Sequence, residues 1–180
     1  MKLKTVLLTA LLAAAPALYA EDIIQVVPLT TRAGVVADDA EFITFTMNNS
    51  SASILGYEFK VKLPDGMSFE DSDPIDYPPF ELVYDRYPYT GRNKVYDHSV
   101  DYAKKSDGWW HVFVSSNKLN PINGDEGEIL RGYFVTDAGM QPGIYPIIIK
   151  ECVMGISGSE GIEPPTSISY VVISEDGQTS

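Results

Sequence analysis

The segment "LGYEFKVKLPDG", from Leu55 to Gly66, decides the fold class. Its apolar and polar residues alternate, so that an extended chain would carry on one face Leu55, Tyr57, Phe59, Val61 and Leu63, and on the other Glu58, Lys60 and Lys62. A period of two residues is that of a β-strand with one face buried and one face in water. Such strands are typical of antiparallel sheets that pack face to face. The segment therefore predicts one strand of a β-sandwich.

Other segments of the chain also have the sequence pattern of β-strands. In "EFITFTMN", residues 41–48, we expect Ile43, Phe45 and Met47 to point inward. Elsewhere, short β-branched and aromatic runs are separated by clusters of Gly, Pro, Asn and Asp, and no stretch has the periodicity of an amphipathic helix. Nine strands are predicted, at about Ile23–Pro28, Glu41–Asn48, Leu55–Leu63, Phe80–Tyr84, His98–Lys104, Trp109–Ser116, Glu128–Thr136, Gly143–Met154 and Thr166–Ser174. The expected fold is all-β: a nine-stranded, antiparallel, jelly-roll-like β-sandwich.

The first twenty residues, "MKLKTVLLTALLAAAPALYA", have the composition of a secretory signal peptide. Two lysines precede a short apolar run, which is followed by small residues. This run is too short to span a bilayer and no second one follows, so we expect export without membrane insertion. Residues 21–180 are then predicted to form a single domain, extracellular or periplasmic.

The chain is strongly acidic. Without the predicted signal peptide it has 11 Lys and Arg against 25 Asp and Glu, a net charge of −14. Repulsion of phosphate backbones and anionic lipids disfavours binding to nucleic acids and to membrane surfaces. Cys152 is the only cysteine, which excludes an intrachain disulfide, and its apolar neighbours predict a buried, unreactive thiol.

Both tryptophans and one of the two histidines lie in "WWHVFVSSNK", residues 109–118. A two-residue turn at Asp107-Gly108 would pair Tyr102 with Phe113 and His98 with Asn117. The two histidines then lie too far apart to share a metal. This register predicts an aromatic face of Trp109, His111, Phe113 and Tyr102, and a second face of Trp110, Val112 and Val114. We expect the second face in the core and the aromatic face in solvent as a binding surface; the inverted assignment is the alternative.

The segment "YPPFELVYDRYPYTGRNKVY", residues 77–96, is rich in tyrosine. Tyr87 and Tyr89 are candidate ligand contacts, because tyrosine offers a large contact area at little cost in conformational entropy. Arg86 and Arg92 are candidate interface residues for a protein partner. The alternative is a long crossover loop that its aromatic residues hold against the sandwich.

Motifs for catalysis and cofactor binding are not found in the sequence. "EDSDPID" resembles a calcium loop, but an EF-hand that starts at Asp71 needs Gly and Glu where the chain has Asp76 and Leu82. A looser calcium site at Asp71, Asp73 and Asp76 is an open alternative to solvated loop charge. "GISGS", residues 155–159, lacks the last glycine and the helix of a nucleophile elbow. The sequence predicts a non-catalytic protein with no cofactor and no defined metal site.

Three runs resemble landmarks of cohesin-like domains. "LGYEFKVKLPDGMSFE" is similar to their third strand, "VFVSSNKLNPINGDEGEILRGYFV" to the landmark that follows, and "MQPGIYPIIIKECVM" to the penultimate strand with its Pro-Gly lead-in. The resemblance covers almost the whole chain after the signal peptide, and the same superfamily contains carbohydrate-binding modules. It implies that the sheet of the third, fifth, sixth and eighth strands meets a dockerin-like or other protein partner. The expected contact residues on that sheet are Lys60, Lys62, Phe113 and Asn117.

The expected function is therefore that of an exported, non-catalytic docking module, linked to polysaccharide degradation machinery. One alternative is a carbohydrate-binding module that holds polysaccharide against Trp109, Tyr87 and Tyr89. A second alternative is a structural subunit of a cell-surface assembly.

Overall fold

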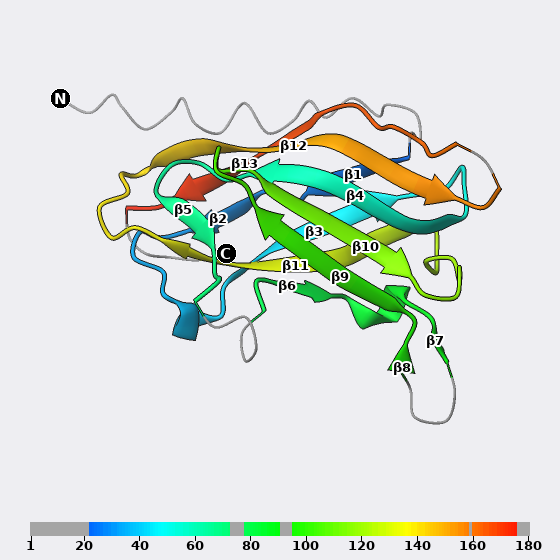
Figure 1. Cartoon of the computed structure of the whole chain (residues 1–180). Helices are drawn as coiled ribbons and strands as arrows, with labels where there is room; N and C mark the ends of the chain where they lie inside the picture. Colours follow the sequence, from blue (N-terminus) through cyan, green and yellow to red (C-terminus); the bar gives the residue numbers. More distant parts are fainter. Residues whose placement is uncertain (1–21, 73–77, 91–94, 159, 176–180) are drawn as a thin grey trace.

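Two β-sheets packed on one another form the body of the molecule (Figure 1). The computed structural model describes residues 22–72, 78–90, 95–158 and 160–175. The larger sheet contains, in spatial order, β2 (Leu29–Thr31), β13 (Ser167–Ile173), β12 (Gly143–Ile156), β4 (Ile54–Lys62), β10 (Trp110–Ser116) and β9 (His98–Lys104). The smaller contains β1 (Ile23–Val26), β3 (Phe42–Asn48), β11 (Glu126–Thr136) and β5 (Met67–Phe69), with β6 (Phe80–Leu82) also paired to β11. Short elements outside these sheets are the ribbon of β7 (Tyr89–Thr90) and β8 (Val95–Tyr96) and the 3-10 helices η1 (Ala37–Asp39) and η2 (Tyr84–Arg86).

The predicted all-β sandwich is confirmed, with two differences in detail. Each of the nine predicted ranges coincides with an observed strand, but β2, β5, β7 and β8 are additional, so the described residues hold thirteen strands. These extra strands have only two or three residues, too few to display a period of two in the sequence. In addition, β2 pairs with β13 in parallel, so the larger sheet is not wholly antiparallel.

The core lies between the inner faces of the two sheets, where the alternation placed it. Ile43, Phe45 and Met47 of β3 face Tyr57, Phe59 and Val61 of β4, and all six side chains are buried. The rings of Phe45 and Phe59 meet with centroids 5.3 Å apart. The inward assignment is therefore confirmed for these residues and for Leu63. It is wrong for Leu55, which is only half-buried, because the register with β12 shifts there and Ile54 is buried instead.

Gly132 of β11 passes close to this aromatic core. A Cβ atom at this position would lie 2.5 Å from the ring of Phe69 and 3.1 Å from that of Phe45. No larger residue fits without displacing a ring, which accounts for a glycine in the middle of a buried strand.

The hairpin of β9 and β10 has a longer turn than the sequence suggested. The N–H of Lys105 donates to the carbonyl of Trp109 at 2.7 Å, so the loop has three residues, Ser106 to Gly108, instead of two. Gly108 has a φ of +83°, as expected for the left-handed last residue of such a loop. The predicted register was therefore wrong by one residue.

That shift reverses the two faces of β9. Phe113 pairs with Asp101, not with Tyr102, and His98 pairs with Ser116, not with Asn117. Tyr102 consequently lies on the core side, where its ring is 5.6 Å from that of Phe80. The prediction that Tyr102 belongs to the exposed aromatic face is wrong.

The tyrosine-rich segment is anchored in the interior at Tyr87, which is 1% exposed. Its hydroxyl donates to the carbonyl oxygen of Ile129 at 2.9 Å and lies 2.9 Å from the hydroxyl of Tyr57. Burial raises the pKa of Tyr87 well above its ordinary value. Tyr87 is thus part of the core, and the prediction that it contacts a ligand is wrong.

Arg86, a candidate interface residue, is also buried. Its guanidinium group donates to the side-chain oxygen of Asn49 at 2.9 Å and to the carbonyl of Gly124 at 3.3 Å. These contacts tie η2 to the loop between β3 and β4 and to the loop between β10 and β11. Arg86 therefore has a structural role, and the expectation of an interface role is wrong. Arg92 lies outside the described residues.

Two further sequence expectations concern Cys152 and the acidic loop. Cys152 is 3% exposed, and burial raises the pKa of its thiol to about 12, as expected of an unreactive cysteine.

In the acidic loop, Asp71 is exposed and lies 3.7 Å from the Nζ atom of Lys104, whereas Asp73 and Asp76 lie outside the described residues. Among the described residues, no helix has the length and apolarity to cross a membrane.

Candidate functional site

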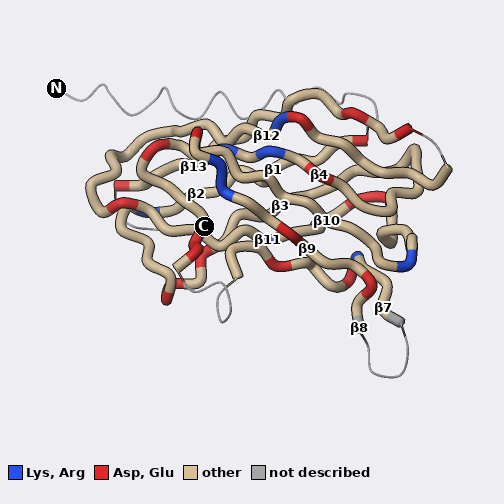
Figure 2. The backbone as a smooth tube through the Cα atoms, viewed as in Figure 1, with Lys and Arg blue, Asp and Glu red and all other residues tan. Residues whose placement is uncertain are grey.

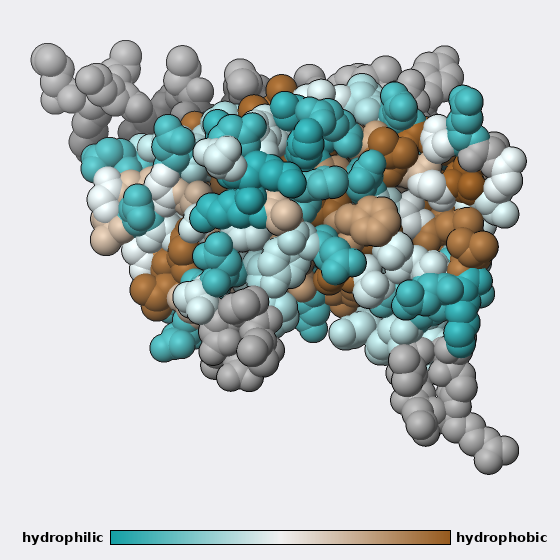
Figure 3. Space-filling view, viewed as in Figure 1, coloured by the Kyte–Doolittle hydropathy of each residue, from teal (hydrophilic) through white to brown (hydrophobic). Residues whose placement is uncertain are grey.

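The surface of the larger sheet that points away from the core, here named the outer face, carries most of the predicted contact residues. The predicted strands 55–63, 98–104, 109–116 and 143–154 are neighbours in this sheet, as the cohesin resemblance implied. Side chains that reach the outer face are those of Glu58, Lys60, Lys62, Trp109, His111, Phe113, Lys150 and Glu151. In the space-filling view, hydrophilic residues gather over its middle and hydrophobic ones toward the end where β10 finishes (Figure 3).

A charged cluster occupies the middle of the outer face. Lys60 and Lys150 are paired across β4 and β12, where two basic segments lie side by side (Figure 2). Glu151 forms ion pairs with both, at 3.3 Å from Lys150 and in closer contact with Lys60. Nearby, Nε2 of His111 lies 3.1 Å from a carboxylate oxygen of Glu58. Hydrogen bonds from Lys60 and Lys150 lower the pKa of Glu151 below its ordinary value.

A β-bulge in β12 creates this cluster. The pairing register with β4 shifts between Lys150 and Val153, and Glu151 has a φ of +49°, in the left-handed region that a glutamate rarely adopts. As a result Lys150 and Glu151 both lie on the outer face, and Cys152 returns to the core. The bulge therefore concentrates charge at one place on the sheet without interrupting the buried side.

Trp109 lies just before β10, partly buried on the outer face. The Nζ atom of Lys150 lies 4.1 Å from the centroid of its ring, within range of a cation–π contact. One face of the indole is therefore already in contact with a side chain of the same molecule. Trp109 therefore packs against the charged cluster and is not an open aromatic platform.

A hollow of about 320 Å³, here named the Phe113 hollow, opens beside the charged cluster. Its rim includes Phe113, 42% exposed, and Leu119, 72% exposed, with Val153 and Ile156. Gly56 and Gly155 are paired opposite each other and both line the hollow, so neither strand has a side chain at that point. The hollow thus exposes apolar surface in a concave shape.

A second exposed apolar strip lies on β12 and β13. Ile144 and Ile168 are 64% and 70% exposed, and Tyr170 is 38% exposed. None of the three lines the Phe113 hollow. The strip adds apolar area to the outer face, apart from the hollow.

The remaining predicted contacts are dispersed. Lys62 is half-buried on the outer face, beyond Lys60 along β4. Asn117 is exposed just after β10, and its side-chain amide donates to the carbonyl of Asp97 at 3.3 Å. Tyr89 is 54% exposed on the β7–β8 ribbon, where its ring lies 5.9 Å from that of Tyr96. Tyr89 therefore belongs to a different surface from Trp109.

Sequence reasoning missed Leu119, Val153 and the pair Gly56–Gly155. The glycines are unremarkable in the sequence because only the register of β4 against β12 brings them together. Leu119 has a φ of +58°, and it follows the last strand residue by three positions. A single leucine in a polar loop is visible in the sequence, but the sequence does not show that its side chain points toward the hollow.

No protein family model and no curated protein sequence matches this chain, but several solved structures do. A cohesin module from a family 33 glycoside hydrolase of Clostridium perfringens matches with a TM-score of 0.60 and 8% identity, over 86% of this chain and 98% of that chain. The sixth cohesin of scaffoldin B from Acetivibrio cellulolyticus, solved in complex with a dockerin, gives 0.62 and 12%, over 85% and 99%. A non-cellulosomal cohesin from the archaeon Archaeoglobus fulgidus gives 0.52 and 9%, over 85% and 94%. The described residues therefore have a cohesin-like β-sandwich fold.

Proposed function

We propose that this chain is a non-catalytic docking module that binds a protein partner through the outer face of its larger sheet. The observation that carries the proposal is the Phe113 hollow, an apolar concavity bordered by the charged cluster. Stable protein interfaces have this anatomy: an apolar centre that takes an anchor side chain of the partner, and a polar rim that excludes water.

The charges of the outer face suggest what the partner presents. Lys60, Lys62 and Lys150 gather there with Glu58 and Glu151, so that three basic side chains face two acidic ones, although the chain as a whole has a net charge of −12. A partner that carries an apolar anchor flanked by carboxylates would match the hollow and the lysines together. The cohesin of Acetivibrio cellulolyticus was solved with a dockerin, and a dockerin-type protein is the partner we propose here.

A carbohydrate-binding role for Trp109 has less support. Stacking against a sugar ring requires an open aromatic face, and Lys150 covers one face of this indole. Export of the chain, and a link between its partner and polysaccharide degradation, belong to the proposal as expectations from the sequence.

The experiment uses the purified protein as bait against secreted and surface proteins of its source, with soluble polysaccharides as competitors. Phe113→Ala is compared with Phe42→Ala, a matched control because Phe42 is 39% exposed on the opposite sheet. We expect one protein to be retained in the presence of the sugars by the wild type and by Phe42→Ala, but not by Phe113→Ala. Retention that Phe113→Ala leaves unchanged, or that a sugar abolishes, would contradict the proposal.

A further inference from the structure

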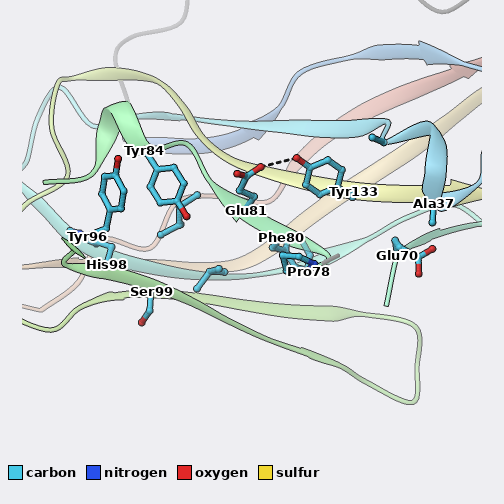
Figure 4. A pocket seen from close by; sticks show the side chains of 13 residues that line it. Ala37, Glu70, Pro78, Phe80, Glu81, Tyr84, Tyr96, His98, Ser99 and Tyr133 are labelled. Atoms are coloured by element: carbon cyan, nitrogen blue, oxygen red, sulfur yellow. Dashed lines mark hydrogen bonds between the residues drawn. The ribbon is translucent and has the colours of Figure 1, made fainter. Parts of the chain in front are cut away.

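A second cavity, here named the tyrosine cleft, lies at the open side of the sandwich between β6 and β9 and is separate from the outer face. It has a volume of about 650 Å³, within the range of roughly 300–1,000 Å³ that is usual for ligand sites. Its chemistry comes from six lining residues: Glu70, Glu81, Tyr84, Tyr96, His98 and Tyr133 (Figure 4).

The tyrosines supply flat aromatic walls. The rings of Tyr84 and Tyr96 are stacked with centroids 4.0 Å apart, and Tyr84 is 45% exposed. Stacking holds both rings in place without help from a ligand, and the exposed side of Tyr84 remains available. A planar group can therefore lie against this wall without reorganising it.

The polar groups of the cleft are mainly acceptors. A carboxylate oxygen of Glu81 accepts the hydroxyl proton of Tyr133 at 2.7 Å, which leaves the other carboxylate oxygen for a ligand (Figure 4). Glu70 is 8% exposed and accepts the N–H of Ser72 at 2.7 Å. Burial, and then the bond to Glu81, raise the pKa of Tyr133, so its hydroxyl stays protonated.

His98 adds an unpaired acceptor. It is 5% exposed, and its Nε2 lies 3.1 Å from the carbonyl oxygen of Leu55, so Nε2 carries the proton in the neutral ring. Its Nδ1 is then an acceptor, and this buried atom has no hydrogen-bond partner within the described part of the chain. The ring nitrogen without a partner is thus closed to solvent, and the neutral ring adds no positive charge to the cleft.

No lysine or arginine is among the described residues that line the cleft. Arg131 is paired with Glu81 across β11 and β6, and its guanidinium lies over the ring of Phe42 and 3.8 Å from Glu128. Neither Glu70 nor Glu81 forms an ion pair with a cation among the described residues. Two carboxylates beside one arginine leave the field of the cleft favourable to a positive ligand.

The position of β9 indicates a peptide. β9 is the last strand of the larger sheet, and its residues Ser99 and Val100 line the cleft. An edge strand presents free backbone N–H and C=O groups to an extended peptide. A peptide that lies along β9 would direct alternate side chains into the cleft.

We propose that the tyrosine cleft binds an arginine side chain of an extended peptide segment in a partner protein. A guanidinium group is planar, carries only donors and is always charged, so it stacks on Tyr84 and donates to the carboxylate oxygen of Glu81 that Tyr133 leaves free. This site is independent of the Phe113 hollow and does not depend on the docking function proposed for the outer face.

The test is a titration of the ¹⁵N-labelled protein by NMR with the blocked peptide Gly-Ser-Arg-Ser-Gly. The same peptide with citrulline, a neutral isostere of arginine, is the matched ligand control, and cellohexaose is the sugar control. We expect amide shifts around Tyr84, Tyr96 and Tyr133 with the arginine peptide, and binding at least about tenfold weaker with citrulline, since charge-assisted pairs are the stronger ones.

Two variants locate the effect. Glu81→Gln preserves the shape of the side chain. It should weaken binding of the arginine peptide by about tenfold, to the affinity of the citrulline peptide. Glu163→Gln removes a carboxylate that is exposed outside the cleft and should change nothing. Equal binding of the two peptides, shifts with cellohexaose alone, or no shifts at these residues up to about 10 mM peptide would each overturn the proposal.

Discussion

Phe42 and Phe113 occupy comparable places on the outer surfaces of the two sheets, yet their surroundings differ. Their exposed fractions are similar, 39% and 42%. The ring of Phe42 is enclosed by its own sheet: Tyr133 meets it edge-on at 5.9 Å, and the guanidinium of Arg131 lies 4.7 Å above it. Phe113 instead borders a hollow. Exposure alone does not identify a binding residue; the concave surface beside it does.

The largest effect we expect is on the inner side of the larger sheet. Phe59 is fully buried on β4, and Phe59→Ala should lower the free energy of unfolding by about 3–5 kcal/mol, because a cavity replaces a ring in a packed core. Urea denaturation measures the loss. A change below about 1 kcal/mol would mean that the core packs differently from the described arrangement.

Gly132→Ala probes the same core from the smaller sheet. The added Cβ would meet the ring of Phe69 at 2.5 Å, so we expect a loss of about 1–3 kcal/mol of stability from overpacking. Gly155→Ala is the matched control, because a Cβ there meets only the carbonyl oxygen of Gly56 at 3.6 Å. Equal denaturation midpoints for the two variants would contradict the close approach at Gly132.

Alanine variants of Phe42 and Phe113 test whether the two rings have different roles. Phe113→Ala should weaken partner binding by about 2 kcal/mol, as a central interface residue does, with stability changed by less than about 0.5 kcal/mol. Phe42→Ala should do the reverse, with a loss of about 1 kcal/mol of stability and unchanged binding, because it loses ring contacts. Calorimetric titration and thermal denaturation of both variants measure the two quantities. The reverse outcome would move the docking surface to the smaller sheet.

Filling the hollow tests its shape separately from Phe113. Gly155→Val places a side chain into the hollow without a close contact at Cβ, and we expect about tenfold weaker binding with an unchanged denaturation midpoint. Gly56 offers no such test, because a Cβ there would lie 2.4 Å from the carbonyl oxygen of Val114. Undiminished binding of Gly155→Val would show that the hollow stays empty in the complex.

The smallest effect concerns pH and contrasts the buried His98 with the more exposed His111. Burial lowers the pKa of His98 below its ordinary value of 6.5, so the unfolded chain binds a proton more readily than the folded one. This contribution to stability is complete above pH 6.5 and is lost as the pH falls below it. His98→Gln should reduce the loss of stability between pH 7 and about 5, whereas the control His111→Gln should retain it; denaturation midpoints across that range decide.

Alternation in the sequence was sufficient to predict the sandwich, because half-buried strands such as 41–48 and 55–63 record in their pattern which side is wet. The β9–β10 hairpin shows the limit. "SDG" is compatible with a loop of two or of three residues. This difference of one residue in loop length decides whether Tyr102 faces solvent or the core. Tyr87 was mispredicted for another reason: its hydroxyl is satisfied inside the core by Tyr57 and Ile129, far away in the sequence.

The candidate site was predicted in part. His111, Phe113, Lys60 and Lys62 do lie on the outer face, because their strands alternate regularly. The bulge at Glu151 and the glycine pair that floors the hollow depend on the register between β4 and β12, which no local pattern encodes. Concave sites arise where segments distant in the chain meet, so they are less visible in a sequence than faces are.

The central claim is that the outer face around the Phe113 hollow is the binding surface, and hydrogen–deuterium exchange with and without the captured partner tests it most directly. We expect slower exchange in β10, in the loop that carries Leu119 and at the bulge of β12, with β3 and β11 unaffected. Protection confined to β3 and β11, around Phe42, would contradict the claim.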